Sequence, residues 1–130
     1  MGCMSNAHPV LADAAAHVAP PLTGPQWEAR VMGWARAMGW IVFHPHDARR
    51  SEPGYPDITA VHPGKRRAIW IECKTGRGKL TLEQAAWRDA LRAAGCEWYE
   101  ARPEREADVL AILAGRPADV GKGQGTGGQR

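Results

Sequence analysis

The stretch that decides the fold is residues 57–74, Asp-Ile-Thr-Ala-Val-His-Pro-Gly-Lys-Arg-Arg-Ala-Ile-Trp-Ile-Glu-Cys-Lys. Two runs rich in β-branched and aromatic residues, 58–61 and 68–74, flank a Pro-Gly pair that is typical of a turn. The stretch therefore predicts a hairpin of two strands. Asp57 begins the first strand, so it should lie beside the end of the second strand, near Glu72.

The polar groups at the end of this hairpin favour a metal-dependent reaction on phosphate. Because side chains alternate along a strand, Glu72 and Lys74 should share one face while Cys73 points the other way. Charged groups on an apolar strand are costly to desolvate, so a metal or a reaction often accounts for them. A Mg²⁺ ion held by Asp57 and Glu72 would polarise a phosphate oxygen, with Lys74 stabilising the developing charge. The alternative is a surface ion pair and a turn aspartate, and these short patterns alone do not decide between the two.

Three segments extend the pattern beyond the hairpin: GYPDI (54–58), IECKTG (71–76) and LTLEQAAW (80–87). In this order they resemble the virus-type replication-repair nuclease (VRR-NUC) domain, a family of the PD-(D/E)xK nuclease superfamily. The resemblance covers about residues 25–113. It implies a Mg²⁺- or Mn²⁺-dependent deoxyribonuclease that acts on branched or structured DNA in DNA repair, with four-way junctions as a candidate substrate, and it suggests a phage or prophage origin.

The resemblance also assigns roles to residues. It implies that Asp57 and Glu72 are metal ligands, that Lys74 is the catalytic lysine, and that the main-chain carbonyl of Cys73 is a further metal ligand. One departure is the thiol of Cys73, since this position is commonly aliphatic. That side chain should face the core, so activity is still expected.

Glu28 is a further candidate metal ligand. Residues 26–38 have the period of an amphipathic helix, preceded by Gly-Pro and ended by Gly39. Glu28 is the only acid in this helix. The superfamily that the chain resembles often supplies a metal-site acid from its first helix. The alternative is a solvated glutamate near the helix N-terminus, where an acid is favourable in any case.

Gln84 also has two interpretations. Thr81-x-x-Gln84 fits a capping box, which needs no catalysis to explain it. The resemblance instead implies that Gln84 lies at the edge of the active site, where it would bond a water or a phosphate. Both can hold at once, and we expect Gln84 to support catalysis without binding the metal.

The net charge of +3 does not by itself indicate a nucleic-acid-binding protein, but the basic residues are uneven. They gather before Asp57 and on both sides of Glu72, where phosphate contacts would position DNA without reading its sequence. Solvated loops are the alternative for each residue alone. The predicted DNA-binding residues are Arg49, Arg50, Lys65, Arg66, Arg67, Arg77 and Lys79.

The remaining patterns predict an α/β fold in the order helix, three strands, helix, strand, helix around a mixed central sheet, the order of the nuclease superfamily core. Further strands are expected at 40–44 and 96–100, and a last helix from Pro103. We predict one nuclease domain at 23–114, a disordered segment at 1–22, and a flexible Gly-rich tail at 115–130. Three tryptophans on apolar stripes should be core residues: Trp27, Trp34 and Trp87.

Other signals are weak. Three widely spaced cysteines argue against disulfides and a zinc cluster, and His44-Pro45-His46 is more typical of a polar loop than of a metal site. No signal peptide or membrane span is recognised, so we expect a cytoplasmic protein in a bacterial or phage-infected cell. Symmetrical cutting of a four-way junction needs two active sites and one small domain holds one, which favours a homodimer. Two other functions remain open: a non-catalytic nucleic-acid-binding module on the same fold, and a structural subunit of a replication or defence complex.

Overall fold

The computed structural model of the protein describes residues 20–46 and 50–115, and the predicted order of helices and strands is confirmed. Most of the predicted disordered ends lies outside these residues, although Leu22 is described and packs against the core. The elements are α2 (Gly24–Ala37), β1 (Ile41–Phe43), β2 (Ile58–His62), the 3-10 turn η2 (Pro63–Lys65), β3 (Arg67–Cys73), α3 (Leu82–Ala93), β4 (Glu97–Ala101), the 3-10 turn η3 (Pro103–Arg105) and α4 (Glu106–Ala114).

The four strands form one mixed sheet in the order β1-β2-β3-β4. β2 pairs antiparallel with both β1 and β3, whereas β3 and β4 run parallel. The hairpin forms as predicted, with Ile58 opposite Ile71, so Asp57 lies beside the end of β3. Because β3 and β4 are parallel, their connection must return along the sheet, and α3 lies in this connection.

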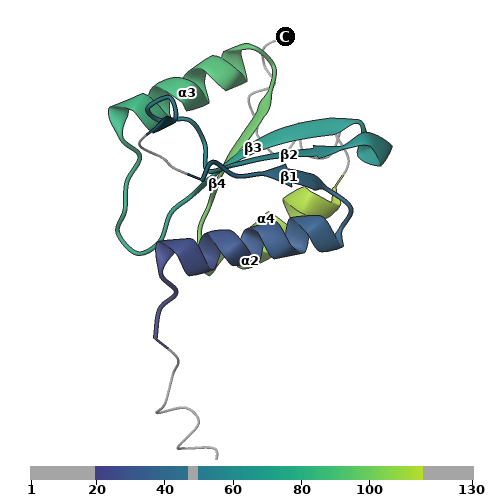
Figure 1. Ribbon diagram of the computed structural model, residues 1–130, viewed down its shortest axis with the longest axis horizontal. Coiled ribbons are helices and arrows are strands. Elements are labelled where there is room, and N and C mark those ends of the chain that lie inside the picture. The colour runs from purple at the N-terminus through teal and green to yellow at the C-terminus, as the bar shows by residue number, and fades with distance from the viewer. Residues whose placement is uncertain (1–19, 47–49, 116–130) are drawn as a thin grey trace, which may run out of the picture.

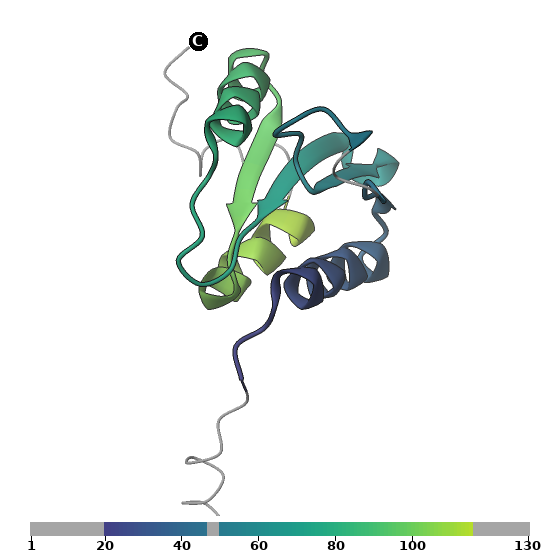
Figure 2. The same ribbon diagram turned by 60° about the vertical axis from the view of Figure 1, so that its left-hand side comes forward.

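The helices form layers on the two faces of the sheet (Figures 1 and 2): α2 and α4 lie on one face, and α3 on the other. The predicted apolar stripe of α2 faces the core: Trp27, Val31 and Ala35 are fully covered, while Trp34 and Met38 are partly buried against them. These side chains join the inward residues of the strands in one core, and the indole N–H of Trp27 donates to the main-chain carbonyl of Ala101 at 2.9 Å. Trp87 is only half-buried, and its ring meets that of Tyr55 edge to face.

The last helix begins later than predicted. Pro103 opens the 3-10 turn η3, and Arg105 has non-helical dihedral angles, φ −116° and ψ 34°, so the α-helix starts at Glu106. The described residues include no helix that is both long and apolar enough to cross a membrane.

Candidate active site

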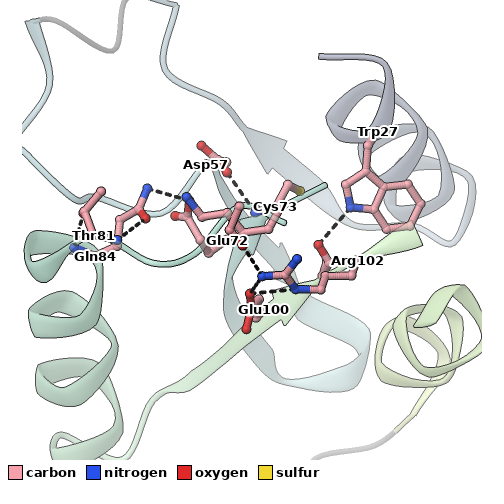
Figure 3. A network of polar contacts seen from close by, with 11 residues as sticks. Trp27, Asp57, Glu72, Cys73, Thr81, Gln84, Glu100 and Arg102 are labelled. Atoms are coloured by element: carbon pink, nitrogen blue, oxygen red, sulfur yellow. Dashed lines mark hydrogen bonds and ion pairs between the residues drawn. The ribbon is translucent and has the colours of Figure 1, made fainter. Parts of the chain in front are cut away.

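Asp57 and the end of β3 are joined by a hydrogen bond. Oδ2 of Asp57 accepts from the main-chain N–H of Cys73 at 2.8 Å, which fixes the carboxylate beside Glu72 (Figure 3). The Cys73 side chain belongs to the core cluster, as alternation along the strand predicted, and burial raises the pKa of its thiol. Its predicted role as a ligand concerns only the main-chain carbonyl, so a buried thiol does not conflict with it.

Glu72 is the most deeply buried acid of the site, with 2% of its surface exposed. Its Oε2 accepts a hydrogen bond from Nε2 of Gln84 at 2.8 Å and lies 3.8 Å from Nζ of Lys74. Its Oε1 is buried and has no hydrogen-bond partner among the described residues. Burial, followed by repulsion from Asp57, raises the pKa of Glu72 to about 8, although Lys74 opposes this change. A buried acid with an unpaired oxygen is costly to ionise and is prepared to receive a cation.

Gln84 both caps α3 and contacts the site. Its Oε1 accepts from the main-chain N–H of Thr81 at 2.9 Å, while the hydroxyl of Thr81 accepts from the main-chain N–H of Gln84 at 3.1 Å. These two bonds are the predicted capping box. The free amide nitrogen is then the group that reaches Glu72, because an amide side chain has separate donor and acceptor ends.

Glu28 projects from α2 toward the same carboxylates. Its pKa is raised, first by burial and then by the charge of Asp57, so the two acids are close enough to repel each other. Oε1 of Glu28 lies 3.5 Å from Nε2 of His44. The other ring nitrogen of His44, Nδ1, lies 2.8 Å from the main-chain oxygen of Asp57. A carbonyl only accepts, so Nδ1 carries the proton and donates.

The sequence patterns did not indicate that His44 belongs to the site, since the His-Pro-His segment was interpreted as a polar loop. His44 joins two elements of the site, since one nitrogen contacts the backbone at Asp57 and the other faces Glu28. No local pattern marks such a residue. Its partners lie on α2 and at the start of β2, and only the sheet brings them together.

The segment before Asp57 is held against α3. Gly54 has φ +84°, and a Cβ at this position would lie 2.4 Å from the main-chain carbon of Glu83 and 2.7 Å from the nitrogen of Gln84. Only glycine fits so close an approach. The hydroxyl of Tyr55, one residue further, bonds the Thr59 hydroxyl at 2.7 Å. This packing ties the position of Asp57 to the start of α3, where Gln84 lies.

The donor set suits a hard divalent cation with few protein ligands. In residues 20–46 and 50–115, no group of three or more His, Cys, Asp or Glu side chains is arranged to hold a metal ion. Mg²⁺, however, is usually bound through one or two carboxylates and keeps several waters. Asp57 and Glu72 supply that number, and the unpaired Oε1 of Glu72 is the orphaned acceptor such an ion would satisfy. The residues present therefore fit the implied Mg²⁺ or Mn²⁺.

The predicted DNA-binding residues separate into two groups. Arg77 and Lys79 are exposed in the loop that leads from Lys74 to α3, next to the site. Lys65 and Arg66 lie in the hairpin turn at the opposite end of the strands, which places them on the order of 15 Å from Asp57 at the rise of a strand. The expectation that basic residues lie on both sides of the site is therefore wrong for Lys65 and Arg66. Arg50 is exposed, and Arg49 lies outside the described residues.

Arg67 does not fit the predicted role in DNA binding. Its side chain is fully buried and pairs with Glu97 through Nη2 at 2.6 Å and Nε at 3.0 Å. Its Nη1 donates to the main-chain oxygens of Ile112 and Gly115 at the end of α4. A guanidinium with these partners stabilises the helix end and is not available to a phosphate.

Comparison with known proteins identifies the family and the fold. The profile of the VRR-NUC domain matches residues 10–104. The chain belongs to the VRR-NUC domain family. The fold is shared with a solved structure described as a VRR_NUC domain protein (TM-score 0.55, 20% identity, covering 72% of this chain and 87% of that one). It is also shared with a structure described as a VRR_NUC domain (TM-score 0.51, 23% identity, covering 65% and 94%). A search of curated proteins found no significant match.

Proposed function

We propose that this VRR-NUC domain is a Mg²⁺- or Mn²⁺-dependent endonuclease that hydrolyses phosphodiester bonds in structured or branched DNA. The observation that carries the proposal is the buried Glu72, whose Oε1 is unpaired beside Asp57 and whose Oε2 faces Lys74 at 3.8 Å. Buried acids with raised pKa values that share a cluster with a lysine are typical of catalytic sites. Membership of the family supports a nuclease-type domain.

Each residue has a defined task in this proposal. Asp57 and Glu72 would hold the ion, with the Cys73 carbonyl as a further donor, and Glu28 would add negative charge from α2. The bound ion would polarise a phosphate oxygen and lower the pKa of an attacking water. Lys74 would place its ammonium against the negative charge that develops on the phosphate.

Two residues support this set. Gln84 donates to Oε2 of Glu72, which fixes the direction of that carboxylate. His44 holds the backbone at Asp57. Hydrogen-bonded partners of metal ligands commonly matter for affinity and rate in this way.

The exposed basic residues next to the site support DNA as the substrate. Arg77 and Lys79 lie three and five positions after Lys74 and are open to solvent. Such residues contact the phosphate backbone irrespective of sequence. The preference for branched DNA stays a proposal that rests on the family.

We also propose that the protein acts as a homodimer, because one domain carries one site. Exposed apolar side chains on β1, the outermost strand of the described sheet, and on its neighbour β2 support a second copy of the chain as their partner: Ile41 is 67% exposed, Phe43 59% and Val61 41%. Exposed apolar groups of this kind, gathered at a sheet edge, often mark an interface. Light scattering across micromolar concentrations should find a dimer, and a monomer at every concentration would contradict this part of the proposal.

Cleavage of labelled four-way junction, flapped, single-stranded and linear duplex DNA tests the activity. Each substrate is incubated with Mg²⁺, Mn²⁺ or EDTA, with wild-type protein beside Lys74→Ala. We expect cutting with either metal, none in EDTA, and none by the variant, whose fold and DNA affinity should be largely retained. Binding without cutting under every metal would instead identify a non-catalytic nucleic-acid-binding module.

A further inference from the structure

The loop of residues 75–80 joins the catalytic end of β3 to the start of α3 and is held from outside by Arg102. Nη1 of Arg102 donates to the main-chain oxygen of Gly76 at 3.1 Å, and its Nη2 donates to that of Gly78. Inside the loop, the N–H of Gly78 donates to the main-chain oxygen of Thr75 at 3.1 Å. The two contacted carbonyls flank Arg77, so Arg102 fixes the backbone on either side of an exposed basic residue.

Arg102 is itself anchored on the sheet. Its Nε donates to Oε2 of Glu100 at 2.9 Å, and Nη2 lies 2.6 Å from the same oxygen. Glu100 lies opposite Glu72 in the register of β3 and β4 (Figure 3). The loop is therefore tied to the strand next to the one that carries the buried acid of the site.

The same contact places the loop against the catalytic lysine. A Cβ built on Gly78 would lie 3.7 Å from Cδ of Lys74, so the Gly78 backbone is next to the Lys74 side chain. Gly76 has φ +56°, a conformation that costs little only for glycine. With two glycines in six residues, the loop has much backbone entropy to lose on binding, and its hydrogen bonds to Arg102 offset part of this cost in advance.

Each of the three side-chain nitrogens of Arg102 already contacts an acceptor, and these acceptors are one carboxylate and two carbonyls. Its side chain is 22% exposed, whereas Arg77 and Lys79 are open to solvent. This division favours a role for Arg102 inside the protein and leaves the phosphate contacts to the two loop residues.

We propose that Arg102 is a positioning residue that holds the 75–80 loop in the shape that presents Arg77 and Lys79 to the phosphate backbone of the substrate. The inference deepens the proposed function and rests on it for the identity of the ligand. Arg102 contacts no substrate atom in this account. It acts through the loop alone.

Hydrogen exchange of the loop amides is the first arm of the test, and it needs no nuclease activity. Arg102→Ala should speed exchange of the Gly78 amide, which donates to the main-chain oxygen of Thr75, by about tenfold, because the loop loses the hydrogen bonds that hold its shape, while β3 and α3 keep their wild-type protection. Arg102→Lys should be intermediate, because one ammonium cannot reproduce the planar fork. Arg105→Ala is the control, since it removes the same charge from an exposed arginine that pairs with exposed Asp108.

DNA affinity measured in EDTA is the second arm. Arg102→Ala should raise the Kd by about tenfold, and Arg105→Ala should change it less than about twofold. In a background that already carries Arg77→Ala and Lys79→Ala, adding Arg102→Ala should have almost no further effect, because coupled residues are not additive.

Each outcome bears on the proposal separately from the nuclease activity. Unchanged exchange in Arg102→Ala would overturn the holding role. Faster exchange with unchanged Kd would overturn the link to DNA. An equal loss of affinity in both backgrounds would mean that Arg102 contacts phosphate directly, which also overturns it. A wild-type protein that binds DNA but never cuts it would contradict the proposed function and leave these three comparisons valid.

Discussion

The starts of α2 and α3 have the same local structure but different surroundings. Thr23 and Gln26 form a capping box on α2, and Thr81 and Gln84 form one on α3, with the same four-residue pattern and nearly equal bond lengths. The amide nitrogen of Gln84 also donates to Glu72. Gln26 is exposed, and the only side-chain bond recorded for it in the described part of the chain is the cap.

The difference shows that a capping motif fixes the orientation of a side chain, while its position in the fold determines what the rest of that side chain can do. In both glutamines the cap uses Oε1 and leaves Nε2 free. Nε2 of Gln84 faces Glu72, a buried carboxylate that needs a donor, whereas Gln26 is exposed. The two sites form a natural matched pair for experiments.

The largest effect, a change in stability with pH, is expected for Glu72. Gln84 of the α3 cap contacts this carboxylate, whereas Gln26 of the α2 cap contacts no such group among the described residues. The pKa of Glu72 is raised from 4.5 to about 8, so between these pH values the folded state binds a proton that the unfolded state has released. The metal-free wild type should therefore lose stability as pH rises through this window, by roughly 1 kcal/mol per pH unit.

Glu72→Gln removes this titration. The free energy of unfolding of the variant, measured with urea in EDTA, should exceed that of the wild type increasingly toward pH 8 and not below pH 4.5. Parallel curves of unfolding free energy against pH for the two proteins would contradict the cost assigned to burying the ionised Glu72.

The next effect separates the two glutamines. Gln84→Ala should lower the rate of DNA cutting by about 10–100-fold, as is typical when a partner of a metal ligand is removed. Gln26→Ala should leave the rate within about twofold of the wild-type rate. Each of the two variants should lose about 1 kcal/mol of unfolding free energy or less, because its helix cap is weakened. Single-turnover cleavage and urea unfolding measure the two quantities. Equal rates in both variants would mean that the Gln84–Glu72 bond has no role in the reaction.

The smallest effect concerns the two threonines. Thr23→Ala and Thr81→Ala should each cost about 1 kcal/mol, because each removes the hydroxyl that accepts from the third helical residue. Cutting should fall a few-fold for Thr81→Ala, since Gln84 loses part of its orientation, and should not change for Thr23→Ala. Thermal unfolding with activity assays at 25 °C would show whether the pair differs only in rate.

Sequence patterns predicted those parts of the fold and site that depend on neighbours along the chain. The hairpin, the shared face of Glu72 and Lys74, the core-facing Cys73 and the Thr81–Gln84 cap all follow from strand alternation or from a short motif. The Thr23-x-x-Gln26 box had the same signal and could have been found.

The features that were missed depend on contacts between distant segments. Arg67 resembles its basic neighbours in sequence, yet its partner Glu97 lies thirty positions away and buries it. His44 and Arg102 gain their contacts only when the sheet aligns α2, β2 and β4 with β3. Charge patterns along a chain do not distinguish a buried arginine from a solvated one.

The central claim is that Asp57 and Glu72 hold a divalent cation, and calorimetric titration of Mn²⁺ into the metal-free protein tests it most directly. The experiment compares the wild type with Glu72→Gln and with Gln26→Ala as the matched control. We predict saturable binding to the wild type and to Gln26→Ala, and none to Glu72→Gln at the same concentrations. Equal binding by all three proteins would place the ion elsewhere and contradict the account.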